Sequence, residues 1–191
     1  QDAILKDSKY ASVVDVIDIK YWHYQADGTV YAPEGGKNLA PRQWARLLKP
    51  KSTSFEQVYR AVKEYRDRYP DKAVIYSGDG ADRYGWAVCM AGGSLPVLPK
   101  ETDPAFLKAI GNTKSSRVAD QYWLSGDRDI IVYANGADSQ TLDLSSFSGR
   151  YEVRFIDMES GNILPAKTSV KASKSVQVKK PSKDVIIWLH K

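Results

Sequence analysis

The hydrophobic pattern divides the chain into two parts. Up to about residue 112, short apolar runs alternate with segments in which apolar residues have helical spacing, and after that point the apolar runs are short and separated by turn-forming residues. The first pattern is typical of an α/β protein, and the second is typical of a small antiparallel β-sandwich. We therefore predict two domains, residues 1–118 and residues 119–191.

The first part begins with the best strand prediction of the sequence, residues 13–22, where β-branched side chains dominate. A helix of about four turns is predicted from a capping box at residues 53–56 to Tyr69, with one apolar face. A short buried strand at 73–76 then leads through a glycine-containing turn to a helix at 86–91 that is apolar on all sides. This order predicts parallel strands connected by helices.

The remaining segments of this part are shorter. A strand is predicted at residues 95–99, and Asp103 followed by Pro104 predicts the N-cap and first turn of a helix over 105–110. A long connection, residues 25–52, separates the first strand from the first helix. Connections of this length are usually binding loops or lids.

The second part has five predicted strands, and two of them are apolar almost throughout, as expected for central strands that are covered on both faces. The predicted strands are residues 121–124, 130–134, 151–156, 176–178 and 185–190.

Composition and charge exclude several classes of protein. With 191 residues, 42% of them hydrophobic, the chain is expected to fold. Its net charge of +5 is spread along the chain and accompanies no nucleic-acid-binding motif, so no nucleic-acid partner is expected. No apolar stretch is long enough for a membrane span, and no signal peptide is seen. Cys89, the single cysteine, lies in an apolar run and is predicted to be buried.

The first candidate catalytic residue is Asp79, which follows the predicted strand at 73–76. Arg83 stands where a dinucleotide fingerprint needs glycine, the Gly-Lys-Ser/Thr of a phosphate loop is absent, and Ser77 lacks the preceding glycine of a nucleophile elbow. A carboxylate at the end of a strand remains, which suits glycoside hydrolysis. The alternative is that Asp79 only stabilises the turn. Asp82 is predicted to cap the following helix.

A second group of polar residues lies at the end of the first strand. Strand alternation places Asp18, Lys20 and Trp22 on one face, and Tyr21 and His23 on the other. Asp18 and Lys20 are either part of a binding site or an ion pair that Trp22 covers.

Two residues of the long connection, Asn38 and Arg42, are candidates for hydrogen bonds to a ligand, although Arg42 is equally suited to anchor the loop. Trp86 joins Tyr21 and Trp22 as a candidate for stacking on sugar faces. His23 and His190 have no neighbouring ligand cluster, so neither a metal nor another cofactor is expected.

Several of these segments resemble a known family. The segments are residues 14–22, 38–43, 77–79, 85–87 and 90–94. They look like the last part of the (β/α)8 barrel of secreted bacterial glycoside hydrolases. The group that they resemble is the apiosidase-like group of polysaccharide-degrading gut Bacteroidetes. Residues 119–191 resemble the β-sandwich that follows those barrels and carries a collagen-binding label. The resemblance implies an α/β plus all-β fold, namely the C-terminal part of a TIM barrel followed by a small β-sandwich, and a secreted or periplasmic protein.

The resemblance also implies that this chain lacks the first part of the barrel. A complete barrel takes about 250 residues, whereas about 115 precede the sandwich here. We therefore expect the C-terminal portion of a larger enzyme, with its acid/base carboxylate on an earlier strand. The partner would be the missing N-terminal half of the barrel or a second copy of the chain, and the chain alone would be inactive. Asp79 stands where the family has a nucleophilic glutamate after the seventh strand.

The predicted function is hydrolysis of glycosidic bonds in a plant or host polysaccharide or oligosaccharide, with Asp79 and Asp18 as the catalytic carboxylates. The predicted substrate-binding residues are Lys20, Tyr21, Trp22, His23, Asn38, Arg42 and Trp86. The alternative is a noncatalytic carbohydrate-binding or scaffold protein that uses the sandwich. It would need exposed aromatic residues on a sheet face, but the sandwich aromatics lie mostly in apolar runs that predict a core: Tyr122, Trp123, Tyr133, Tyr151, Phe155 and Trp188.

Overall fold

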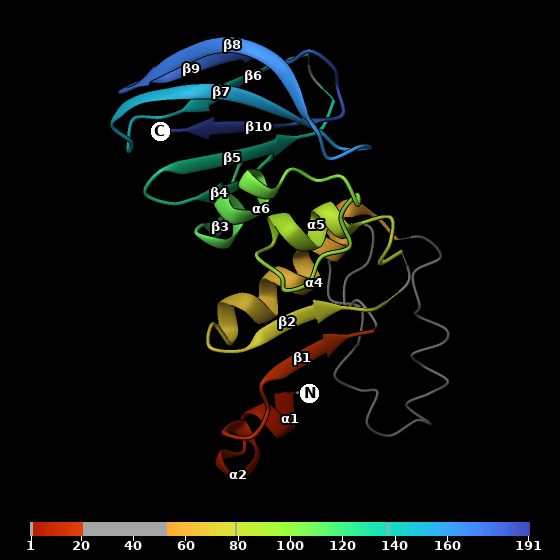
Figure 1. Cartoon of the computed structure of the whole chain (residues 1–191). Helices are drawn as coiled ribbons and strands as arrows, with labels where there is room; N and C mark the ends of the chain where they lie inside the picture. Colours follow the sequence, from red (N-terminus) through yellow and green to blue (C-terminus); the bar gives the residue numbers. More distant parts are fainter. Residues whose placement is uncertain (1, 21–52, 79, 137) are drawn as a thin grey trace. The chain divides into compact units, whose positions relative to one another are not determined.

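The structure, a computed structural model, describes residues 2–20, 53–78, 80–136 and 138–191 (Figure 1). The chain forms two compact units, unit 1 (Gln1–Val97) and unit 2 (Leu98–Lys191). The predicted domain limits, 1–118 and 119–191, stay a prediction. Within the described ranges, none of the helices has both the length and the hydropathy that crossing a bilayer requires.

Unit 1 is built on two parallel strands, β1 (Val16–Ile19) and β2 (Ala73–Tyr76), which pair from Val16 opposite Ala73 to Ile19 opposite Tyr76. The helix between them in the chain, α4 (Phe55–Arg68), packs on this sheet, and α5 (Gly85–Met90) packs on α4 (Figure 1). Two single-turn helices, α1 (Asp2–Leu5) and α2 (Ser8–Ala11), precede β1. Unit 1 is therefore a β-α-β unit with additional helices.

The capping box of α4 lies one residue later than predicted. The Ser54 hydroxyl accepts a hydrogen bond from the Gln57 amide at 3.2 Å, and the Ser54 amide donates to Gln57 Oε1 at 3.1 Å. The predicted box of Thr53 and Glu56 fits the same pattern, but Glu56 pairs with Arg60 one turn later instead. Either pair satisfies the sequence rule, so only the structure distinguishes them.

Replacing Ser54 by alanine should lower the free energy of unfolding by about 1 kcal/mol, because the first turn of α4 would lose a capped amide. Thr53→Ala is the matched control and should cost less, since the contact that Thr53 makes with Tyr84 uses its backbone carbonyl. Urea denaturation of both variants measures the difference. A larger loss for Thr53→Ala would contradict this assignment of the cap.

The apolar helix after β2 is confirmed, and every residue of α5 is buried. Cys89 is among them, and its burial raises the pKa of the thiol to about 12. The prediction that Asp82 caps this helix is wrong. The N-cap is Tyr84, which makes no side-chain capping bond and instead donates its hydroxyl to the Thr53 carbonyl at 2.8 Å.

The predicted strand at 95–99 is absent. Pro96 and Pro99 have no amide hydrogen to donate to a strand ladder, and Leu95 has a positive φ of 51° that an extended strand does not contain. One contact with the sheet remains, because the Ser94 amide donates to the Val74 carbonyl at 2.6 Å.

The described residues are mostly β-sheet with few helices, and no (β/α)8 barrel is seen among them. Of the expected barrel portion, the described residues therefore contain one β-α-β unit, formed by β1, α4 and β2. The two parallel strands of that unit are too few to close a barrel, which needs about eight.

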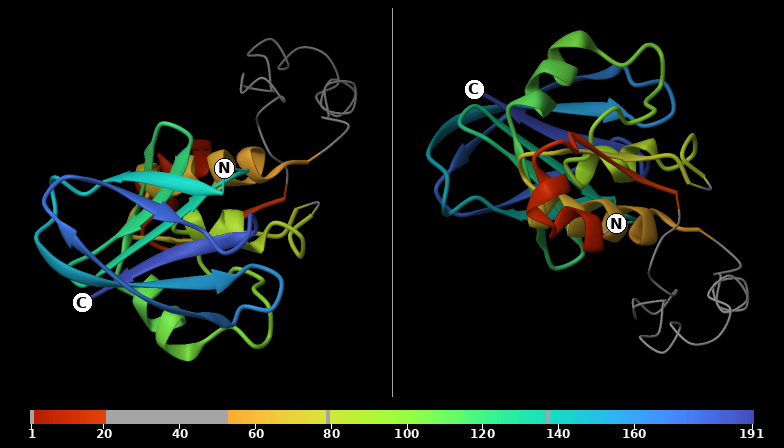
Figure 2. Two further views of the ribbon diagram at one scale, coloured as in Figure 1. Left: turned by 90° about the horizontal axis from the view of Figure 1, so that it is seen from above. Right: turned by 90° about the horizontal axis from the view of Figure 1, so that it is seen from below.

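Unit 2 is an antiparallel two-sheet sandwich, as predicted, preceded by α6 (Pro104–Gly111). Its six-stranded sheet has the order β3-β4-β5-β10-β7-β8, and β6 pairs with β9 in a second sheet (Figure 2). The strands are β3 (Lys114–Val118), β4 (Gln121–Ser125), β5 (Asp129–Ala134), β6 (Ser139–Asp143), β7 (Gly149–Asp157), β8 (Ile163–Ala172), β9 (Ser175–Lys179) and β10 (Val185–His190).

The core of unit 2 lies between the two sheets. Leu142 and Val178 from β6 and β9 pack with inward-facing residues of the larger sheet such as Val132, Val153 and Ile187. The two strands predicted to be central, β5 and β10, are adjacent in the middle of the larger sheet and almost completely buried. Asp103 caps α6 as predicted, and accepts from the amides of Ala105 and Phe106.

The turn after β7 provides a pH-dependent contribution to stability. Asp157 accepts hydrogen bonds from the Ser160 amide at 2.7 Å and the Ser160 hydroxyl at 2.8 Å, which lower the pKa of the carboxyl. A lowered pKa stabilises the fold above the carboxyl's unfolded-state pKa, about 3.9, and this contribution disappears as pH falls through the lower native value.

Asp157→Asn should therefore reduce the free energy of unfolding at neutral pH by more than it does in acid. Denaturant titrations between pH 7 and pH 3 measure the difference between the two proteins. A difference that stays constant over this range would contradict the role given to the Asp157 charge.

Candidate functional site

The candidate site is at the C-terminal ends of the two parallel strands of unit 1. Ile19 is opposite Tyr76 at these ends, and the Ser77 amide donates to the Ile19 carbonyl at 3.0 Å. The residues that follow each strand, Lys20 and Ser77, therefore start from neighbouring positions. In α/β folds this edge of a sheet is where ligands bind.

Asp18 is at the centre of the described part of the site. Its Oδ1 accepts a hydrogen bond from the Ser77 hydroxyl at 2.6 Å, and its Oδ2 lies 3.7 Å from Lys20 Nζ. The predicted ion pair on one face of β1 is confirmed, but it is not buried, because the two side chains are 33% and 67% exposed. A carboxylate that is oriented by a hydroxyl and an ammonium group, and remains accessible, can accept hydrogen bonds from a polyhydroxylated ligand.

Gly78 allows the chain after β2 to pass close to the end of β1. A Cβ at this position would lie 2.7 Å from the Lys20 carbonyl oxygen and 2.7 Å from the Tyr76 hydroxyl, closer than such atoms approach. Ser77 is a functional candidate that the sequence does not reveal, since its motif is informative only about a role as nucleophile. Its contact with Asp18 depends on the pairing of β1 with β2, two strands that lie far apart in sequence.

Most of the other predicted site residues lie outside the described residues, so their roles stay predictions. These are Asp79, Tyr21, Trp22, His23, Asn38 and Arg42. The residues on both sides of Asp79 are described: Ser77 is fixed to β1, and the Arg83 and Tyr84 amides both donate to the Gly80 carbonyl, at 3.0 and 2.8 Å.

Trp86 is described, and it is a core residue of α5, with 6% of its surface exposed. A stacking platform for a sugar needs an accessible ring face. The burial of Trp86 therefore does not suit it to stack on a sugar.

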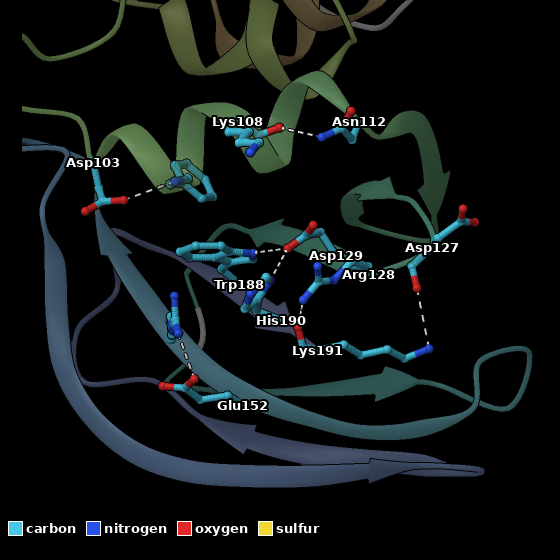
Figure 3. A network of polar contacts seen from close by, with 12 residues as sticks. Asp103, Lys108, Asn112, Asp127, Arg128, Asp129, Glu152, Trp188, His190 and Lys191 are labelled. Atoms are coloured by element: carbon cyan, nitrogen blue, oxygen red, sulfur yellow. Dashed lines mark hydrogen bonds and ion pairs between the residues drawn. The ribbon is translucent and has the colours of Figure 1, made fainter.

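A separate network of polar contacts connects two central strands of unit 2 (Figure 3). Asp129, at the start of β5, is buried, and its Oδ1 accepts from Trp188 Nε1 at 2.8 Å and pairs with His190 Nδ1 at 2.7 Å. Both partners belong to β10, so the carboxylate fixes the end of β10 to β5. This network accounts for His190, which the sequence left without a role.

The neighbouring charges on β7 are also paired. Arg154 donates to Glu152 at 2.8 Å, which raises the pKa of Arg154 and lowers that of Glu152, and its guanidinium lies 4.8 Å from the centroid of the Trp188 ring. In the described part of the chain, no group of three or more histidine, cysteine or acidic side chains could hold a metal ion. Arg154 thus connects Glu152 of β7 with Trp188 of β10.

The aromatic residues of the sandwich are in the core. The six that would have to be exposed for recognition by a sheet face are all buried: Tyr122, Trp123, Tyr133, Tyr151, Phe155 and Trp188. Phe106 of α6 packs against Trp188, with ring centroids 5.3 Å apart. The feature that would favour a noncatalytic carbohydrate-binding protein is thus absent from these residues.

Solved structures with a similar fold include glycoside hydrolases. A glycoside hydrolase of family 5 from Bacteroides vulgatus ATCC 8482 matches 98% of this chain and 52% of its own, with a TM-score of 0.58 and 14% identity. A second structure, described as a glycoside hydrolase, matches 92% of this chain and 52% of its own, with a TM-score of 0.54 and 12% identity. At these identities the likeness shows the fold alone. The chain spans about half the length of these structures.

Sequence comparison gives a family without a known function. No curated protein matches the sequence. A family model described as a domain of unknown function, DUF6298, matches residues 1–113, which include all of unit 1 and the helix α6 of unit 2. This match covers more than half of the chain, and the chain therefore belongs to the DUF6298 family.

Proposed function

We propose that this chain is the C-terminal portion of a glycoside hydrolase that cleaves glycosidic bonds in a plant or host polysaccharide or oligosaccharide. The observation that carries the proposal is the accessible Asp18 carboxylate at the C-terminal ends of two parallel strands, held by Ser77 and Lys20, with Asp79 two residues after Ser77. The similar fold of two glycoside hydrolases supports it. From the resemblance to apiosidase-like enzymes we further propose that the complete protein belongs to that group and is secreted or periplasmic.

The proposed chemistry assigns different roles to the two carboxylates. Glycoside hydrolysis needs one carboxylic acid that protonates the leaving oxygen and one carboxylate that either attacks the anomeric carbon or activates a water. We assign the second role to Asp79. Asp18 already has a hydroxyl and an ammonium group as partners, which suits it to hold sugar hydroxyl groups beside the reacting bond. The proton donor would then come from an earlier strand of the complete protein.

The experiment is a screen of the complete protein for reducing-sugar release from plant polysaccharides and for cleavage of aryl glycosides. Turnover of at least one substrate class is the expected result. The rival function predicts no turnover, together with binding of residues 98–191 to glycans or collagen. That combination would replace the hydrolase proposal.

A further inference from the structure

Among the residues that the structure describes, one face of the unit 1 sheet is incompletely covered. Parallel sheets are usually covered on both faces, and a sheet of two strands is marginal by itself. On one face, Ile17 and Ile19 of β1 and Val74 and Tyr76 of β2 are buried, and α4 packs on the sheet. On the other face Ile75 is half-buried and Val16 is 51% exposed.

The two edges of this sheet also differ. The Ala73 amide donates to the Asp15 carbonyl, and the Ser77 amide donates to the Ile19 carbonyl. Alternate residues of β1 therefore direct their backbone groups toward β2. Val16 lies between them in this alternation, so its amide and carbonyl point to the opposite edge. Among the described residues, β1 and β2 are the only strands of their sheet. The outer edge of β2 already receives the Ser94 amide. The outer edge of β1 is therefore the candidate docking edge.

The helices before β1 indicate what kind of strand fits there. In a β-α-β unit the helix lies between two parallel strands, as α4 lies between β1 and β2. The helices α1 and α2 occupy the equivalent position before β1, and Lys72 Nζ fixes the end of α2 to the start of β2 by donating to the Ala11 carbonyl at 2.7 Å and the Val14 carbonyl at 2.8 Å. A preceding parallel strand would complete a second unit of the same kind.

We propose that the outer edge of β1 receives a parallel strand from polypeptide that precedes this chain in the same protein. The similar structures support this occupant, because this chain aligns over nearly its whole length with only about half of theirs. The inference rests on the sheet and is independent of the hydrolase chemistry, so its test uses structural readouts.

Hydrogen exchange compares the 191-residue chain with the protein extended to its natural N-terminus. We expect exchange at the Val16 amide to slow by roughly tenfold or more in the extended protein, while amides of β5 and β10 keep their rates. Val16→Glu should lower the melting temperature of the extended protein strongly and that of the 191-residue chain little. Val13→Glu is the control, since Val13 lies before the strand and is 70% exposed.

Three results would overturn the proposal. The first is a natural N-terminus at Gln1. The second is Val16 exchange that is equally slow in the monomeric 191-residue chain, which would mean that this chain itself covers the edge. The third is slow exchange only in a dimer detected by light scattering, which would assign the edge to a second copy of the chain.

Discussion

Replacing Gly85 by alanine is expected to prevent unit 1 from folding. Gly85 is the first residue of α5, and an added Cβ would lie 1.6 Å from the Val97 carbonyl oxygen and 2.5 Å from its carbon. Both obstacles are backbone atoms, so no side-chain rotation relieves the overlap. Either α5 or the segment that ends unit 1 would have to move, and α5 is buried throughout. We expect a loss of more than about 4 kcal/mol, which is exceptional for a single substitution.

Gly111→Ala is the matched control. Gly111 ends α6, and an added Cβ there would contact nothing within 4 Å. This change should be neutral or stabilise by about 0.5–1 kcal/mol, because alanine favours helices. Hydrogen exchange separates the two units: Gly85→Ala should abolish protection in α4 and β2 while β5 and β10 stay protected. Native protection of α4 in that variant would show that the close approach to Val97 is wrong.

The second large effect is expected at Asp79 in the complete protein. Asp79→Asn removes the charge of the proposed reacting carboxylate and keeps its shape, so kcat should fall by roughly 10²–10⁴-fold without a change in melting temperature. Asp18→Asn should mainly raise KM, since Asp18 is proposed to hold substrate. Steady-state kinetics on the best substrate of the screen distinguishes the two effects.

Asp82→Asn is the control for the loss of charge. Asp82 lies three positions after Asp79 in the sequence, is exposed and does not cap α5, so its variant should keep wild-type kcat. If Asp79→Asn and Asp82→Asn were equally active, Asp79 would have only the turn-stabilising role that the sequence also allows.

The sequence predicts elements well where apolar residues are continuous, as in β5, β10 and α5. It misses the strands β3, β6 and β8. The residues of β3 are mostly exposed and polar, and β6 buries only Leu142. In β8, Pro165 interrupts the sequence pattern that would predict a strand. Both β3 and β8 are at the edges of the larger sheet, where strands are less apolar because one side lacks a neighbour. Hydrophobic patterning is therefore informative for central strands and weak for edges.

The site is predictable only as far as it is local. Alternation along one strand predicts that Asp18 and Lys20 share a face, and their ion pair confirms it. The hydrogen bond from Ser77 to Asp18 joins residues 59 positions apart, and no sequence pattern specifies which strands become neighbours. Trp86 shows a different difficulty of prediction. An aromatic residue in an apolar helix is as suited to a core as to a sugar site, and the sequence does not distinguish the two.

The most direct test of the central proposal is glycosidase activity of the 191-residue chain compared with the complete protein, each with and without Asp79→Asn. The two carboxyl groups of a hydrolase must face each other at about 5–9.5 Å, and we assign the acid to an earlier strand. The complete protein should therefore release reducing sugar, its Asp79→Asn variant should not, and the 191-residue chain should be inactive. Robust turnover by the 191-residue chain that Asp79→Asn abolishes would contradict the account, because both carboxyl groups would then lie within these residues.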